Sequence, residues 1–139
     1  HSCVRRVDMV FGIGTDIVQV SRIEQVWQRF GERFANHLLL DEEIDLFRHH
    51  KRPVRFLSTR FAIKEATVKA MGTGFAHGIW IRDVGMIPND WGQPQLIYSS
   101  RGRRVRERLG IGDGHLSVTD EAGLVVAVAV LMIASEAGD

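Results

Sequence analysis

The sequence of 139 residues contains a single cysteine, Cys3, so no disulfide can form within the chain. This cysteine usage fits a reducing compartment, and we expect a cytoplasmic protein. The longest apolar run, from Leu124 to Ala134, is too short to cross a bilayer. Residues 1–8 lack the apolar segment of a signal peptide. We therefore expect no interaction with a membrane.

An excess of charge of one sign is also missing. The chain has 18 lysines and arginines against 17 acidic residues, and the formal net charge of +1 argues against general affinity for nucleic acids. Hydrophobic content of 45% and charged content of 25% are ordinary for a globular protein, and the length suits one domain. We expect this domain to span residues 9–135, with a leader or expression remnant at 1–8 and a short tail at 136–139.

The strongest helix signal is the segment Arg60–Ala70. It contains good helix formers without proline or glycine, and Gly72 and Gly74 follow its end. Pro53 separates it from the preceding segment, so the helix is expected to begin near Val54.

Two apolar bands of this helix flank a polar slot that contains Ser58, Glu65 and Lys69. Such a helix should be largely covered by other elements, and ionisable groups near a core need partners. Two interpretations are open. Glu65 and Lys69 form an ordinary i,i+4 ion pair, or they belong to a metal or phosphate site completed by a second carboxylate from elsewhere.

A candidate for that carboxylate is Asp16, in a predicted strand from Met9 to Val18. Gly12 and Gly14 share its face of the strand, which leaves room beside Asp16 for a ligand or for another backbone. The alternative is that both glycines serve packing and that Asp16 only ends the strand. The third glycine of a dinucleotide-binding fingerprint is missing.

Ser21 and Glu24 predict a capping box at the start of the next helix. The apolar residues expected on its core face are Ile23, Val26, Trp27, Phe30 and Phe34. Arg22, Arg29 and Arg33 lie on a neighbouring face, which is either simply solvated or a docking surface for an acidic partner.

The remaining elements follow from turn residues and periodicity. We expect a short helix from Asp41 and a very basic, solvated helix over Ser99–Leu109 that ends at Gly110, Gly112 and Gly114. The expected strands are Ile79–Ile87, Gln95–Tyr98 (the second strand of a hairpin), His115–Thr119 and Leu124–Ile133, the last covered on both faces. Helices grouped between strands indicate an α+β domain with an antiparallel sheet packed on the long central helix.

Three segments of the sequence, taken together, resemble one known family. They are Gly12–Val18, Arg60–Ala66 continued by Lys69–Gly74, and His115–Thr119 before the last strand. In this order and spacing they resemble the holo-acyl-carrier-protein synthases, the small bacterial 4′-phosphopantetheinyl transferases. The resemblance extends from Met9 to about Ser135 and implies the fold of that family.

The resemblance implies transfer of phosphopantetheine from coenzyme A to a serine of acyl carrier protein, in fatty acid biosynthesis. Asp16 and Glu65 match the family's Mg²⁺ ligands, and hard cations suit carboxylates together with phosphate oxygens. Lys69 matches a position that contacts the pyrophosphate. For the general base we favour Glu65 acting through a metal-bound water. The resemblance assigns coenzyme A contacts to Arg60, Lys64, Lys69, Gly72, His115 and Ser117.

The resemblance also implies two kinds of partner. Arg22, Val26, Arg29 and Arg33 match the surface that meets the carrier protein, although Arg33 aligns only with a one-residue insertion. A homotrimer is implied, with active sites between subunits, so that His115 and Ser117 approach the coenzyme from a neighbour. Asp120 stands where many relatives have histidine, so no role of that histidine is transferred.

Two alternatives to the transferase are weighed. A nucleic-acid-binding module could use the arginines of Arg101–Arg108, but the net charge and the lack of interleaved aromatic residues weigh against it. An inactive scaffold is disfavoured by the intact acidic pair.

Overall fold

The computed structural model describes residues 9–135, so the expected leader (1–8) and tail (136–139) lie outside the described residues. The elements follow in the order β1 (Val10–Gln19), α1 (Val20–Phe30), α2 (Glu32–Leu38), α3 (Asp41–Arg48), α4 (Pro53–Met71), the short 3₁₀ helix η2 (Ile81–Asp83), β2 (Val84–Pro88), β3 (Pro94–Tyr98), α5 (Ser100–Leu109), β4 (Ile111–Glu121) and β5 (Leu124–Ile133).

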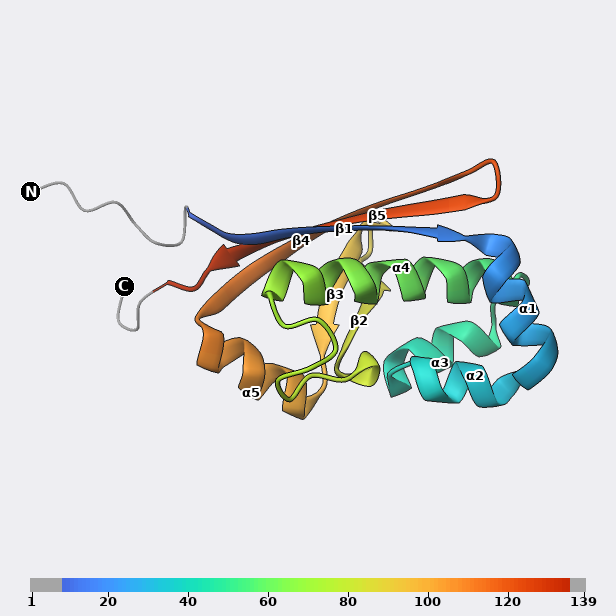
Figure 1. Cartoon of the computed structure of the whole chain (residues 1–139), viewed down its shortest axis with the longest axis horizontal. Coiled ribbons are helices and arrows are strands. Elements are labelled where there is room, and N and C mark those ends of the chain that lie inside the picture. Colours follow the sequence, from blue (N-terminus) through green and yellow to red (C-terminus); the bar gives the residue numbers. More distant parts are fainter. Residues whose placement is uncertain (1–8, 136–139) are drawn as a thin grey trace, which may run out of the picture.

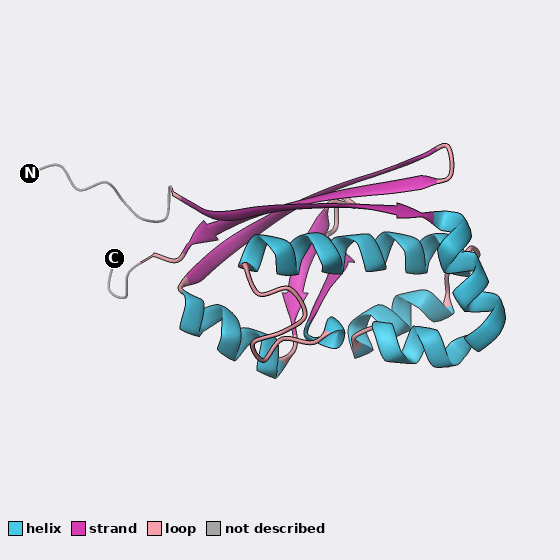
Figure 2. Ribbon diagram, in the orientation of Figure 1, coloured by secondary structure: helices cyan, strands magenta, loops and turns pink. Residues whose placement is uncertain are grey.

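The long helix α4 lies along one face of an antiparallel sheet with strand order β1-β5-β4 (Figure 1). A separate hairpin, β2–β3, crosses behind α4 in this view and contacts both α4 and β4 (Figure 2). Helices α1 to α3 cluster at one end of the molecule, and α5 lies at the opposite end. The predicted α+β architecture, an antiparallel sheet on a central helix, is confirmed.

The ends of α4 agree with the sequence signals. Pro53 occupies the first turn, where its missing N–H costs nothing. Gly72 adopts the left-handed conformation with φ 79°, and its N–H donates to the carbonyl of Lys69 at 3.1 Å.

The two glycines of β1 are required by the closeness of α4. A Cβ on Gly12 would overlap the carbonyl oxygen of Ala70, and one on Gly14 would overlap that of Ala66. Two strand residues advance about 6.7 Å and four helix residues about 6 Å, so successive glycines meet successive turns. The backbone of α4 thus fills the space that Gly12 and Gly14 leave open. Asp16 is the next residue on the same face of β1.

The central strand β5 is covered on one face only, which corrects the prediction of two covered faces. Val125, Ala127, Ala129 and Leu131 are fully buried towards α4, whereas the alternate residues are half-buried. On the outer face Ile13 pairs with Val130 and Ile17 with Val126, and both isoleucines are 62% exposed. The prediction failed because a continuous apolar run does not reveal how many faces of a strand are covered by other elements of the same chain.

Other local predictions were wrong at α1 and α2. Gly31, with φ 54°, divides the expected single helix into two. No side chain caps α1. Its first N–H, that of Val20, donates to the carbonyl of Gly123, so a contact with the β4–β5 turn replaces the capping box. Phe30, expected in the core, is 41% exposed because it ends α1 beside this break.

Two boundaries also differ from the predictions. The segment Ile81–Asp83 forms η2, so only the second half of the expected strand, β2, is extended. Of the glycines expected to end α5, only Gly110 does so, while Gly112 and Gly114 lie within β4. The hairpin at 84–98 and the strand that contains His115–Thr119 are confirmed.

Candidate active site

The structure brings Asp16 of β1 and Glu65 of α4 together. Both carboxylates line one surface hollow of about 810 Å³, which is also lined by Arg22 and Val26 of α1 and by Phe61 of α4. The hollow forms because α1 leaves the end of β1 and passes across α4, as seen at the right of Figure 1. Two acidic residues distant in sequence thus share one solvent-accessible site.

Lys69 completes this cluster. Its ammonium donates to Asp16 Oδ1 and to the carbonyl of Thr15, both at 3.1 Å. The Lys69 side chain is 51% exposed and that of Asp16 is 14% exposed. Lys69 therefore pairs with Asp16 across two elements, in place of the i,i+4 pair with Glu65 that the sequence left open.

Glu65 is electrostatically strained. Partial burial raises the pKa of its carboxyl above the usual value, the charge of Asp16 raises it further, and Lys69 partly opposes the shift. A repulsion between the two carboxylates therefore remains beside Lys69. A divalent cation bound between Asp16 and Glu65 would relieve it.

The chemistry of the donors fits Mg²⁺. Among residues 9–135 no group of three or more His, Cys, Asp or Glu side chains is arranged to hold a metal. The site thus offers two carboxylates. Proteins commonly bind Mg²⁺ with one or two carboxylates, while substrate phosphates and waters supply the other ligands.

Lys64 does not lie in this hollow. Its side chain is fully buried, and its Nζ donates to Glu43 Oε1 at 2.7 Å and to the carbonyl of Val84 at 2.6 Å. In this arrangement the Lys64 side chain is not free to contact a ligand, because both bonds hold the ammonium inside the protein, and its contact with coenzyme A stays a prediction. The sequence analysis missed the partner, Glu43, which lies among the acidic residues of the first turn of α3 and gives no sign of its burial.

Arg60 is nearly buried as well. Its Nε lies 3.1 Å from the carbonyl of Met86 and 3.3 Å from Glu43 Oε2, and its guanidinium covers the ring of Phe56. An edge of Arg60 lines a smaller hollow with His50. Its contact with coenzyme A stays a prediction. So does that of Gly72, which is exposed at the end of α4.

His115 and Ser117 lie on the opposite face of the sheet from Asp16. Asp16 pairs with Ala127, which faces α4, whereas His115 and Ser117 pair with Val130 and Val128 on the outer face. Within one chain these two side chains cannot reach the hollow, because the sheet lies between them.

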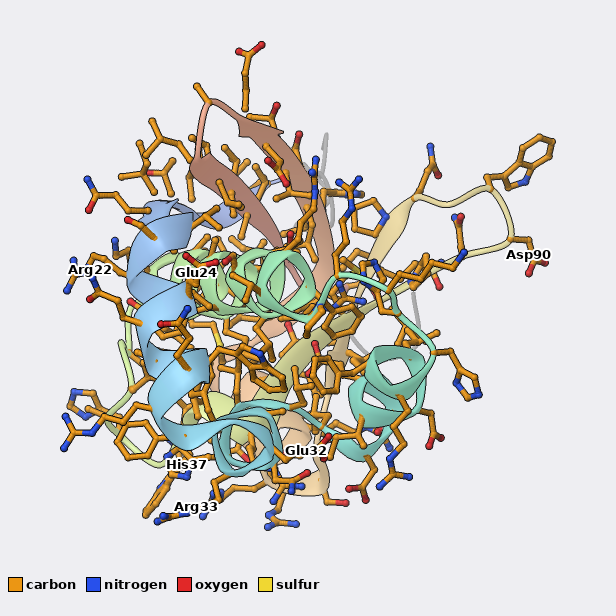
Figure 3. All side chains as sticks on the ribbon, turned by 90° about the vertical axis from the view of Figure 1, so that its right-hand side faces the viewer. Arg22, Glu24, Glu32, Arg33, His37 and Asp90 are labelled. Atoms are coloured by element: carbon orange, nitrogen blue, oxygen red, sulfur yellow. The ribbon has the colours of Figure 1, made fainter. Side chains whose placement is uncertain are left out.

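The predicted docking residues lie on the surface of α1 and α2. Arg22, Arg29 and Arg33 are exposed, and Figure 3 shows Arg22 and Arg33 on the same side of the molecule. The guanidinium carbons of Arg29 and Arg33 lie 5.2 and 5.9 Å from the ring centre of Phe30. Val26 is half-buried and lines the hollow with Arg22. Val26 and Phe34 line this hollow and also a second one, which Phe30 and Arg33 line as well, so the two hollows adjoin.

The arginines of α5 are partly engaged in holding the fold, which corrects their description as simply solvated. Arg101 pairs with the buried Asp83 at 2.9 Å, and Arg106 donates to the carbonyls of Ile111 and Gly112. Asp120, at the position where the resemblance places a histidine in many relatives, pairs with Arg55 at 2.7 Å.

No helix within residues 9–135 is long and apolar enough to cross a bilayer.

Comparisons with known proteins identify the family of this chain. Residues 12–129 match the model of the 4′-phosphopantetheinyl transferase superfamily. The chain is 38% identical to the holo-[acyl-carrier-protein] synthase of Escherichia coli O9:H4 over 122 residues, which are 88% of this chain and 97% of the relative. It is 36% identical to the synthase of Hamiltonella defensa over the same shares.

Solved structures give the same result. The synthase of Neisseria meningitidis superposes with a TM-score of 0.84 at 38% identity, covering 88% of this chain and 98% of that one. The Helicobacter pylori synthase in complex with coenzyme A superposes with a TM-score of 0.75 at 28% identity, covering 86% and 98%. This chain, with its acidic pair in a shared hollow, therefore belongs to the 4′-phosphopantetheinyl transferase superfamily and, within it, to the holo-[acyl-carrier-protein] synthases.

Proposed function

We propose that this protein transfers 4′-phosphopantetheine from coenzyme A to a serine of apo acyl carrier protein, in the cytoplasm and in fatty acid biosynthesis, with Mg²⁺ bound by Asp16 and Glu65. The observation that carries the proposal is the meeting of these two carboxylates beside Lys69 in one open hollow. The names of the relatives support the substrate and the acceptor.

Mg²⁺ bound there would neutralise charge on the pyrophosphate of coenzyme A while its phosphorus is attacked. Asp16 and Glu65 would hold the cation from the side of the protein. Glu65 is the candidate for accepting the proton of the carrier's serine, through a water, because its carboxylate lines the hollow that the serine would enter.

The reaction then has a simple balance. The serine oxygen forms a bond to the phosphorus that bears the pantetheine. The bond from this phosphorus to the oxygen of the adenosine-side phosphate breaks, and adenosine 3′,5′-bisphosphate leaves. Lys69, half exposed and already at the edge of the site, would stabilise or protonate the leaving oxygen.

The carrier protein would dock on α1 and α2. Arg22, Arg29 and Arg33 offer positive charge to an acidic partner, and Val26 offers an apolar contact beside them. The docked serine would then enter the hollow at Arg22, which lines it together with Asp16 and Glu65.

A homotrimer with active sites between subunits is part of this proposal. The outer face of the sheet exposes Ile13 and Ile17 beside half-buried residues of β5, a surface suited to a second copy of the chain. Because His115 and Ser117 lie on this face, they could contribute only to a neighbour's coenzyme site.

The test of the site uses Asp16→Ala and Glu65→Ala. Each should abolish Mg²⁺-dependent loading of apo carrier protein while the circular dichroism spectrum stays unchanged. Loading by either variant at a near wild-type rate would refute the assignment of the site.

A further inference from the structure

The rotation of α4 about its own axis decides in which direction Glu65 points. Residues on nearly all of its sides are buried, so it has no single apolar stripe that must face inward. Towards β1 it rests on Gly12 and Gly14, which meet the backbone of α4 at Ala70 and Ala66. Contacts on another side of the helix would act together with this one in turning Glu65 towards Asp16.

A buried ionic cluster joins α4 to α3 and β2 on the other side of the helix. Glu43 Oε1 accepts from Lys64 Nζ at 2.7 Å, and Glu43 Oε2 lies 3.3 Å from Arg60 Nε. Lys64 also donates to the carbonyl of Val84, and Arg60 donates to that of Met86. Two cationic side chains one helical turn apart are therefore each held at two points.

The carboxylate of Glu43 is itself held firmly. The backbone N–H of Leu40 donates to Oε1 and that of Met86 to Oε2, both at 3.0 Å. Gly85 packs directly against this carboxylate, since a Cβ on Gly85 would overlap the Glu43 carboxylate and the Leu40 side chain. Glu43 is thus a fixed anchor.

The cluster and the active-site residues are adjacent along α4. Lys64 directly precedes Glu65, so the two side chains leave the helix about 100° apart. A small rotation that broke the bonds of Lys64 would swing Glu65 by the same angle. Burying three charged groups is costly, and a known use of such clusters is to select one arrangement among several.

We propose that Glu43 is a positioning residue, which through Lys64 and Arg60 sets the rotation of α4 and so holds Glu65 opposite Asp16 for the divalent cation. This inference rests on the proposed function for its metal. It assigns to Glu43 no contact with substrate.

The first test is Lys64→Met, which removes the main clamp but leaves Glu43 paired with Arg60. The probe is Mn²⁺ in the presence of coenzyme A, followed by electron paramagnetic resonance without carrier protein. The affinity for Mn²⁺ should fall by about tenfold or more, as for other residues that orient metal ligands. The KM for carrier protein should not change. Wild-type affinity in this variant would overturn the inference.

A second variant keeps the proposal testable if Lys64→Met does not fold. Glu43→Asp retains the charge but withdraws the carboxylate by one methylene, and it should weaken Mn²⁺ binding in the same way. Wild-type binding would contradict the inference.

The control separates positioning from loss of stability. Asp83 is also a buried carboxylate, which accepts from Ser99 and Arg101 beside α5. Asp83→Asn should lower the melting temperature but leave the affinity for Mn²⁺ unchanged, and equal weakening by this variant would overturn the inference. If the wild-type protein neither binds Mn²⁺ nor loads carrier protein, it is the proposed function that fails.

Discussion

The ammonium of Lys69 lies 3.1 Å from Asp16 Oδ1, although the two residues are 53 positions apart in the sequence. This contact joins β1 to α4 at the point where Glu65 also faces the hollow. Partial burial and then the charge of Asp16 raise the pKa of the Glu65 carboxyl, and Lys69 opposes only part of this shift. The site is therefore under electrostatic strain without a cation.

This strain predicts a pH dependence of stability. A carboxyl whose pKa is raised on folding holds its proton more tightly in the native state, so its stabilising effect is present below the unfolded pKa and is lost as pH rises through the folded pKa. Glu65→Gln should therefore raise the free energy of unfolding at pH 7 relative to wild type, measured by urea in the presence of a chelator. Near pH 4 the difference should shrink. A variant less stable than wild type at pH 7 would contradict this explanation.

The close packing of Gly12 and Gly14 in β1 against α4 predicts that even a small side chain is not tolerated at these positions. Gly14→Ala should destabilise the fold by about 3 kcal/mol, because the new Cβ meets the backbone of α4 at Ala66 and neither element can yield easily. The measurement is urea denaturation.

A matched control for this variant is Ser21→Ala, since Ser21 is exposed and caps no helix. Its effect should stay below about 0.5 kcal/mol. A loss of about 1 kcal/mol, typical of a true N-cap, would revive the capping box.

The exposed sheet face predicts an effect on assembly. Ile17→Glu should convert the proposed trimer to monomers, because it places a charge among apolar residues of β1 and β5. Light scattering after gel filtration measures the mass. Trp80→Ser is the control, since Trp80 is equally exposed, at 62%, but lies in the loop before η2. A wild-type protein that is monomeric at micromolar concentration would refute the proposed assembly.

The basic face of α1 predicts a selective loss of carrier binding. Arg22→Glu and Arg29→Glu should each raise the KM for carrier protein far more than the KM for coenzyme A, because they reverse charge on the docking surface only. Arg103→Glu on α5 should change neither value. Equal increases for both substrates in the α1 variants would argue against the docking surface.

The sequence was sufficient for the parts of the fold that depend on local signals. Pro53 and Gly72 mark the ends of α4, and the turn around Asn89 marks the hairpin. It failed where a distant contact replaces a local one. Ser21 and Glu24 match a capping box, but in the structure the N–H of Val20 at the start of α1 donates to the distant carbonyl of Gly123 instead.

The site shows the same division. Asp16 and Glu65 were found because their segments resemble a known family, and the structure brings them to one hollow. The burial of Lys64 was not foreseen, because a sequence does not reveal which of two lysines on one helix is buried. Its partner Glu43 lies on another helix, and only packing brings them together.

Mass spectrometry of an apo acyl carrier protein incubated with this protein, coenzyme A and Mg²⁺ tests the central claim most directly. The account predicts that the carrier gains the mass of one phosphopantetheine group on its serine, and that Asp16→Ala, Glu65→Ala or removal of the metal by a chelator prevents the gain. An unmodified carrier with the wild-type protein, or full modification by either variant, would contradict it.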